Sequence, residues 1–137
     1  MTDPALVEKK LAQIDTYVAD LRRLARPAEL ERDVRERRFV EHTLQLAIQA
    51  ALDVASHIVS DERLGEPGTN RELFDLLERA GWLDAPRAAA LRNMAGFRNI
   101  LVHGYDDVDL AIVRDVVARH LDDLLAFAST VRGRLHA

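Results

Sequence analysis

Cysteine is absent from this chain of 137 residues, which excludes disulfide bonds, thiolate nucleophiles and cysteine-based metal sites. Aromatic residues make up only 5% of the sequence, so an apolar core has to be built from leucine, valine, isoleucine and alanine. No apolar run approaches the roughly 18 residues that a membrane-spanning helix needs, and no signal-peptide pattern follows the first methionine. We therefore expect a cytoplasmic protein with no membrane partner, and the length predicts a single domain over residues 1–137.

The charge balance argues against a protein that coats nucleic acid. The net charge is −4 at pH 7, whereas proteins of that kind are usually basic, so we expect no DNA partner. Two arginine-rich stretches, residues 22–26 and 32–38, either guide RNA toward the protein or form a salt-bridged surface. The glutamates interleaved with the second stretch favour the salt-bridged surface.

The spacing of apolar residues predicts helices along the whole chain, because apolar positions recur at helical steps and glycine and proline stand at the boundaries. Thr69 and Glu72 fit the capping box that begins a helix, and Gly104 fits the left-handed residue that ends one. The expected helices cover residues 4–25, 28–60, 69–81, 84–103 and a segment from 107 or 109 to at least 128. Long helices with short connections predict an all-α, up-and-down bundle of about five helices.

The residues best suited to chemistry lie in one segment, FRNILVHGYDD, at positions 97–107. The segment holds Arg98, Asn99, His103 and Tyr105 at the predicted end of a helix. Asn99 and His103 are four residues apart and share a helix face. Arg98 and His103 are separated by about 140° around the axis, but a long side chain and a histidine in the last turn can still converge.

These residue types suit the cleavage of RNA. The ribose 2′-hydroxyl has to lose a proton and the 5′-oxygen has to gain one, and histidine exchanges protons readily near neutral pH. The negative charge that develops on the phosphoryl oxygens favours a bidentate guanidinium. We therefore expect His103 as the acid or base, Arg98 as the phosphate ligand, and Asn99 as a supporting partner of the phosphate or of the histidine.

The spacing of the arginine and the histidine is weak evidence by itself. About 0.6 pairs with four residues between them are expected by chance in a chain with 17 arginines and 5 histidines. Arg37 and His42 form a second such pair, inside the helix predicted over residues 28–60. Only Arg98 and His103 lie at a helix end and are followed by Gly-Tyr, and this context favours them.

A polar stripe follows the helix predicted over residues 28–60. Its members fall within about 120° of one another around the axis: His42, Gln45, Gln49, Asp53, Ser56 and His57. A solvated face is the usual explanation, but an enclosed groove or a dimer seam also fits, because apolar positions flank the stripe. Asp53 is a candidate to orient His103 or Arg98. His57 is better explained as a hydrogen-bonded core histidine than as a functional residue.

FRNILVHGY, with Arg98, His103 and Tyr105, resembles the Arg-x4-His-x-Tyr signature of HepT-like HEPN proteins. LDVASHIV, residues 52–59, resembles the Asp-x-x-x-His stretch on the long helix of that family. The resemblance implies a helical homodimer in which two Arg/His sets face one cleft and cut RNA without a metal ion or a cofactor. It also implies the toxin of a type VII-like toxin–antitoxin pair, whose MntA-like nucleotidyltransferase antitoxin adenylylates the motif tyrosine, here Tyr105.

Two alternatives remain open beside this interpretation. The chain also fits a non-catalytic HEPN dimer that serves as a binding or regulatory subunit of a nucleotidyltransferase. The intact set of Arg98, His103 and Tyr105 favours the enzyme, whereas the acidic charge and the lack of an aromatic platform for stacking bases favour the other function. Asp53 and His57 are spaced as metal ligands on one helix face, but the resemblance favours cleavage without metal.

Overall fold

Helices form the regular secondary structure in the part of the chain that the computed structural model describes, residues 3–104 and 108–136. The elements are α1 (Pro4–Leu24), the 3-10 turn η1 (Pro27–Glu29), α2 (Val34–Asp61), α3 (Asn70–Arg79), α4 (Ala85–His103), α5 (Leu110–Arg119) and α6 (Leu121–Leu135). Within those residues, no helix is long and apolar enough to cross a membrane. The prediction of an all-α fold is confirmed.

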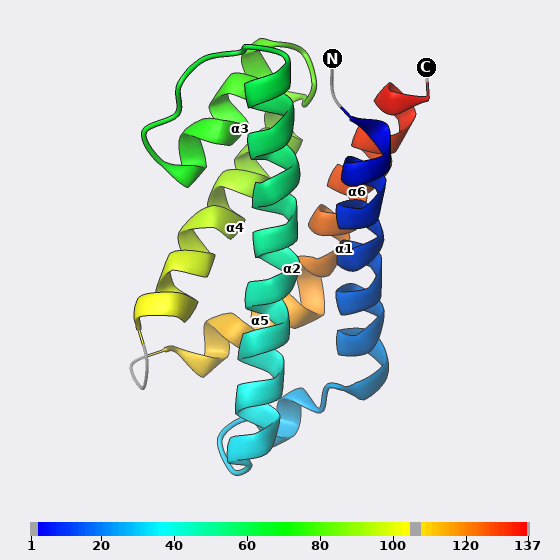
Figure 1. Cartoon of the computed structure of the whole chain (residues 1–137). Helices are drawn as coiled ribbons and strands as arrows, with labels where there is room; N and C mark the ends of the chain where they lie inside the picture. Colours follow the sequence, from blue (N-terminus) through cyan, green and yellow to red (C-terminus); the bar gives the residue numbers. More distant parts are fainter. Residues whose placement is uncertain (1–2, 105–107, 137) are drawn as a thin grey trace.

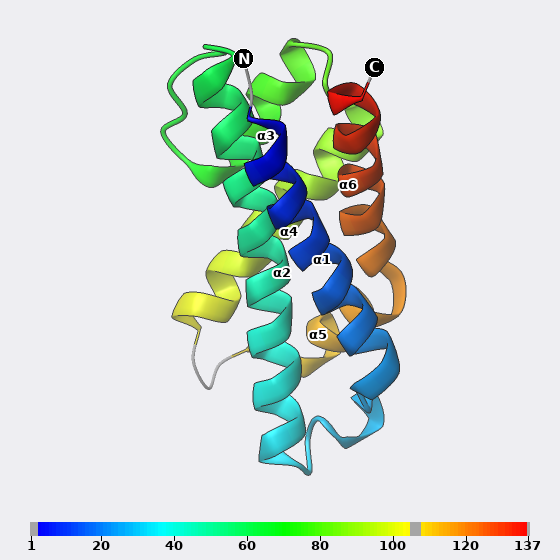
Figure 2. The same ribbon diagram turned by 45° about the vertical axis from the view of Figure 1, so that its right-hand side comes forward.

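The long helices alternate in direction and pack around α2 (Figure 1). α1 lies along one side of α2, α4 packs on another, and α3 contacts both α2 and α4. α6 runs beside α1 and returns the chain to the end of the bundle where it began, so the two termini lie at the same end (Figures 1 and 2). α5 is oblique to the long helices and leads from the far end of α4 into α6 (Figure 1). The arrangement is an up-and-down bundle.

The core is mainly aliphatic, as the low aromatic content requires. α1 buries a single stripe at three- and four-residue steps: Val7, Leu11, Ile14, Val18 and Leu21. α2 is buried on more than one side, because α1, α3 and α4 all pack on it. Phe74 of α3 meets Phe127 of α6 edge to face, with ring centroids 6.0 Å apart. This contact joins two helices that are far apart in the sequence.

α2 begins later than the apolar pattern predicts. Instead of a helix from residue 28, the chain forms the turn η1 and then starts α2 at Val34. The cause is Asp33, whose carboxylate accepts hydrogen bonds from the backbone N–H groups of Arg35 at 2.9 Å and Glu36 at 3.4 Å. Such a cap satisfies N–H groups that have no partner in the first turn of a helix.

The last predicted helix is divided into α5 and α6, so the prediction of about five helices is one short for the described residues. The break falls at His120, with φ −117° and ψ −1°. The imidazole lies 3.2 Å from Asp115 Oδ2 and 3.1 Å from Asp123 Oδ2, with one carboxylate on each side of the break. The change of direction lets Val113 on α5 and Leu121 on α6 both reach the core, where each is at most 1% exposed.

Gly104 ends α4 as predicted, but not in the left-handed conformation. Its φ is −80° and its ψ is −21°, which any residue can adopt. Glycine is favoured there by space instead, because a Cβ atom on residue 104 would lie 2.5 Å from the carbonyl oxygen of Ile100. The glycine after α3, Gly81, does take the left-handed conformation, with φ 80°.

The predicted capping box at the start of α3 is half formed. Thr69 Oγ1 accepts a hydrogen bond from the backbone N–H of Glu72 at 3.3 Å. The Glu72 carboxylate accepts from the backbone N–H of Gly68 at 2.6 Å, one residue before the cap, rather than from Thr69. The helix therefore starts where the sequence predicts, but the glutamate reaches one residue further back along the chain than in a capping box.

Candidate active site

α4 carries both members of the predicted catalytic pair. Asp84 caps the helix by accepting a hydrogen bond from the backbone N–H of Arg87 at 2.9 Å, and the helix then runs to His103. Arg98 and His103 therefore both belong to its last two turns. Arg98 is half-buried, whereas Asn99 and His103 are exposed. The end of this helix thus has two exposed polar side chains, Asn99 and His103, and one half-buried guanidinium, that of Arg98.

The Arg98 side chain turns toward α2. Its Nη2 donates a hydrogen bond to Gln49 Oε1 at 2.9 Å. Its Nε is buried and has no hydrogen-bond partner within residues 3–104 and 108–136. In the same residues no carboxylate pairs with this guanidinium. A guanidinium that has no carboxylate partner in these residues, and whose Nη1 makes no hydrogen bond there, is suited to bind an anion such as phosphate.

Gln49 links Arg98 to two further side chains. Gln49 Nε2 donates to Asp53 Oδ1 at 2.9 Å, and Lys10 Nζ of α1 donates to Asp53 Oδ2 at 3.2 Å. The four side chains form a continuous row across α1, α2 and α4. Asp53 lies one side chain away from Arg98, rather than against Arg98 or His103 as the sequence suggested. No feature of the sequence marks Lys10, which enters the row only through the packing of α1 on α2.

His103 and Asn99 stand apart from this row. Both are exposed, and neither side chain forms a hydrogen bond or ion pair with another residue of the described part of the chain. The predicted modification site, Tyr105, lies outside the described residues. In the described residues, side-chain contacts therefore surround Arg98 but not His103.

The second arginine–histidine pair has a different environment. Arg37 Nε and Nη2 donate to the carbonyl oxygens of Leu30 at 3.3 Å and Glu31 at 3.4 Å, which fastens the loop before α2. His42 is exposed on α2. This structural use of Arg37 favours Arg98 and His103 as the functional pair.

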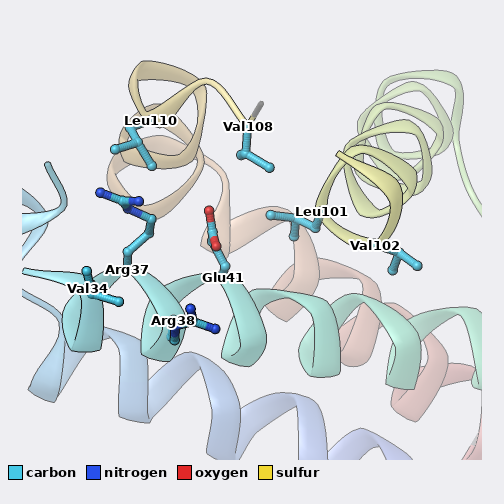
Figure 3. A pocket seen from close by; sticks show the side chains of 8 residues that line it. All are labelled: Val34, Arg37, Arg38, Glu41, Leu101, Val102, Val108 and Leu110. Carbon is cyan, nitrogen blue, oxygen red and sulfur yellow. The ribbon is translucent and has the colours of Figure 1, made fainter. Parts of the chain in front are cut away.

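A hollow of about 700 Å³ lies beside the end of α4. Its lining comes from the start of α2, the end of α4 and the segment that leads into α5: Val34, Arg37, Arg38, Glu41, Leu101, Val102, Val108 and Leu110 (Figure 3). Arg37 and Glu41 extend from α2 toward the segment before α5 (Figure 3). Neither Arg98 nor His103 lines the hollow, so it is a neighbour of the predicted catalytic pair and not part of the same site.

His57 is at the edge of α2 and not in the core. Its Nε2 lies 3.4 Å from Asp61 Oδ2, and the two side chains are 34% and 30% exposed. The prediction of a hydrogen-bonded core histidine is therefore wrong, because the side chain is partly exposed and its contact is an ion-pair distance to Asp61. Metal-ligand geometry is absent in residues 3–104 and 108–136, where no three His, Cys, Asp or Glu side chains could hold one ion.

Three of the seven arginines in the two arginine-rich stretches pair with carboxylates in the described residues. The pairs within or from these stretches are Arg22–Asp122, Arg23–Asp20 and Arg32–Glu29. Glu31 instead binds Arg114 of α5, and this hydrogen bond lowers the pKa of the Glu31 carboxyl. These contacts agree with a salt-bridged surface.

The chain matches a family model described as ribonuclease HepT-like over residues 10–131. It is 37% identical over 89 residues to the mRNA nuclease HepT of Shewanella oneidensis, which covers 65% of this chain and 67% of that protein. It is 32% identical over 109 residues to the tRNA nuclease HepT of Aphanizomenon flos-aquae, which covers 78% of this chain and 74% of that protein.

The fold also matches a solved structure of a tri-AMPylated Shewanella oneidensis HEPN toxin in complex with an MNT antitoxin. The TM-score is 0.87 at 30% sequence identity, over 97% of this chain and 99% of that one. The resemblance that the residues around Arg98 and His103 suggested thus extends through the whole bundle. The chain belongs to the HepT-like ribonuclease family.

Proposed function

We propose that this chain is a metal-independent endoribonuclease and the toxin of a toxin–antitoxin pair, with one domain over residues 1–137. The relatives support the activity, since two of them are named as nucleases of mRNA and of tRNA. The observation that carries the proposal is the state of Arg98. Its guanidinium is held by a neutral amide and lacks a carboxylate partner in the described residues, as a phosphate ligand requires.

In the proposed reaction the ribose 2′-oxygen attacks the adjacent phosphorus, and the bond from phosphorus to the 5′-oxygen breaks. A base takes the 2′ proton and an acid delivers a proton to the 5′-oxygen, so the products are a 2′,3′-cyclic phosphate and a 5′-hydroxyl. His103 is the base or the acid. Arg98 stabilises the charge that develops on the non-bridging oxygens. Asn99 supports the phosphate or the histidine from the same helix end, and Asp53 supports Arg98.

A homodimer is part of this proposal. His103 is exposed at the end of α4, apart from the row that holds Arg98, so one protomer leaves the site open on that side. Ile100 lies between them in the sequence and is 46% exposed, which gives this helix end an apolar group suited to burial by a second copy. Two protomers would provide two Arg/His sets, one histidine for each proton transfer. A strict monomer in light scattering at micromolar concentration would count against this arrangement.

Regulation is proposed to act through Tyr105, two positions after His103. The relative in complex with an MNT antitoxin is tri-AMPylated, which supports a nucleotidyltransferase partner of the MntA type for this chain. An AMP attached to the phenol adds a phosphate near the catalytic pair. That phosphate would occupy the guanidinium meant for substrate and repel an incoming RNA backbone. Modification would then silence the enzyme without unfolding it.

Expression of the chain alone tests the activity. We expect wild-type protein to arrest growth and degrade cellular RNA, and we expect His103→Ala to do neither while accumulating to the same level. His42→Ala is the matched control, because it removes the other histidine of an Arg-x4-His pair and should remain toxic. Intact RNA and normal growth with well-folded wild-type protein would favour the alternative of a non-catalytic subunit.

Co-expression with an MntA-like nucleotidyltransferase tests the regulation. Intact-protein mass spectrometry should show mass added in AMP units on the wild type. The added mass should be lost in Tyr105→Phe, which should stay active as a nuclease, whereas Tyr17→Phe should still be modified. An inhibited but unmodified protein would contradict the regulatory proposal and leave the nuclease proposal intact.

A further inference from the structure

Three side chains stand in a row behind Arg98, and they come from two other helices. The row runs from Arg98 Nη2 to Gln49 Oε1 at 2.9 Å, from Gln49 Nε2 to Asp53 Oδ1 at 2.9 Å, and from Asp53 Oδ2 to Lys10 Nζ at 3.2 Å. We propose that Lys10, Asp53 and Gln49 are positioning residues that fix the Arg98 guanidinium for phosphate without placing a carboxylate against it. The inference rests on the proposed ribonuclease function and names further residues on which that function depends.

The row determines how the Gln49 amide is turned. A guanidinium can only donate hydrogen bonds and an ionised carboxylate can only accept them. The amide oxygen must therefore face Arg98, and the amide NH₂ must face Asp53. A glutamine without the carboxylate behind it could rotate and turn donors toward the guanidinium. Asp53 thus fixes the acceptor that holds Arg98, although it does not contact Arg98 itself.

The amide also separates two charges. A carboxylate in the place of Gln49 would form an ion pair with Arg98 and compete with phosphate for the same donors. With glutamine in between, Arg98 forms no ion pair with this row, and Lys10 compensates the charge of Asp53. Nη1 of Arg98 makes no hydrogen bond in the described residues, so the outer edge of the guanidinium still has donors for a phosphate oxygen.

Stability alone is a poor explanation for the outer end of the row. The Lys10 and Asp53 side chains are 34% and 39% exposed, and ion pairs at such exposure contribute little to folding. The Nε of Arg98 is buried without a partner, which costs stability rather than adding to it. A row of weak contacts that ends at the Arg98 guanidinium is better suited to orient that guanidinium than to stabilise the fold.

The central test is Gln49→Glu, which keeps the size of the side chain and adds a carboxylate against Arg98. We expect kcat for RNA cleavage to fall about tenfold or more, because the new carboxylate would compete with the phosphate for the Arg98 donors. A hydrogen bond between charged groups contributes about 1.5 kcal/mol or more, which corresponds to about tenfold in rate. Gln45→Glu is the matched control, with the same charge change one turn earlier on the same polar stripe, and should change kcat less than about threefold. The midpoint of thermal unfolding should be similar in both variants.

The outer end of the row is tested by Lys10→Gln, with Lys9→Gln as its neighbour control. We expect Lys10→Gln to lower kcat several-fold without changing the unfolding midpoint, Lys10→Arg to restore it, and Lys9→Gln to match the wild type. A readout that needs no RNA is the ¹H–¹⁵N signal of the Arg98 guanidinium, assigned by its loss in Arg98→Lys. Hydrogen exchange at this group should become faster in Gln49→Leu.

The proposal is overturned if Gln49→Glu and Lys10→Gln cleave RNA like the wild type, or if Gln45→Glu lowers kcat as much as Gln49→Glu. It is also overturned if hydrogen exchange at Arg98 is unchanged in Gln49→Leu. Arg98→Ala distinguishes failure of the ribonuclease function from failure of the positioning role of the row. If Arg98→Ala is still active, the proposed function fails; if it is inactive while the variants of the row are normal, only the row fails.

Discussion

Arg132 and Arg98 both reach from one helix to another, but their surroundings differ. Arg132 of α6 donates from Nη2 to Asp15 Oδ2 at 2.6 Å and from Nε to Glu8 Oε2 at 3.4 Å, both on α1. Arg98 of α4 donates to an amide oxygen of α2, and its Nε has no partner in the described residues. One guanidinium is compensated by two carboxylates, and the other by none in that part of the chain.

The difference separates an arginine used for folding from one available for an anion. Arg92 is an arginine of the same kind as Arg132, because ion pairs with Asp75 at 3.1 Å and Glu78 at 2.9 Å join it to α3. The hydrogen bond with Asp15 raises the pKa of Arg132, and the hydrogen bond with Glu78 raises that of Arg92. Carboxylate partners stabilise the charged form and consume the donors. An arginine without carboxylate partners is also charged, but its donors are free for a ligand.

Replacing each arginine by alanine should give the largest contrast. We expect Arg98→Ala to lower kcat/KM for RNA by about 10²-fold or more, because the loss of a group that stabilises transition-state charge has that effect. Arg132→Ala should remain within about threefold of the wild type, since it lies in another part of the bundle. Cleavage assays on the two purified variants measure the contrast. Equal losses in both would remove the distinction between the two arginines.

Lysine substitutions sharpen the comparison. Arg98→Lys should lose about tenfold or more in kcat, because an ammonium is a point charge that cannot make the planar, bidentate contact to phosphate. Arg132→Lys should keep its activity, since a charge between two carboxylates does not require a fork. The same cleavage assay measures both variants. An active Arg98→Lys would show that a positive charge at this position is enough for catalysis without a bidentate contact.

The free energy of unfolding should depend more on Arg132 than on Arg98, which is the reverse of the order expected for activity. Arg132→Ala should reduce the free energy of unfolding by about 1 kcal/mol, because partly exposed ion pairs contribute in that range. Arg98→Ala should change it less, and Arg35→Ala, an exposed arginine of α2, serves as the control. Urea unfolding followed by circular dichroism gives the values. A larger loss in Arg98→Ala than in Arg132→Ala would reassign Arg98 to folding.

The smallest expected effect is on acid stability. Hydrogen bonds from His136 and then from Arg132 lower the pKa of Glu8 in the folded protein. A carboxyl whose folded pKa is depressed contributes stability above its unfolded pKa, and that contribution is lost as the pH falls through the folded value. Unfolding midpoints measured between about pH 5 and pH 3 should therefore fall less steeply in Glu8→Gln than in the wild type. Glu66→Gln, an exposed loop variant, should behave like the wild type.

The sequence predicts the helix that carries Arg98 better than it predicts the contacts of the Arg98 side chain. The helix that ends after His103, the all-α bundle and the family could be inferred from local spacing and from the motif around Arg98. The contact between Arg98 and Gln49 could not, because it joins residues 49 positions apart and depends on how α4 packs on α2. Lys10 is 43 positions from Asp53 and has no pattern that marks it.

The differences between the predicted and the observed helices have local causes. The apolar pattern continues through His120, so it does not reveal the break that divides α5 from α6. The start of α2 depends on which of several charged residues caps the helix, and the structure assigns that role to Asp33. Gly104 is needed for its small size at Ile100 and not for a left-handed φ, a distinction that the sequence does not carry.

If Arg98 and His103 cut RNA without a metal ion, the ends of the RNA products should show it. Purified wild-type protein should cleave RNA in the presence of EDTA and leave 2′,3′-cyclic phosphate and 5′-hydroxyl ends, identified by mass spectrometry. His103→Ala, prepared in the same way, should leave the RNA intact. Loss of wild-type cleavage in EDTA, 5′-phosphate ends, or equal cleavage by His103→Ala would each contradict the account.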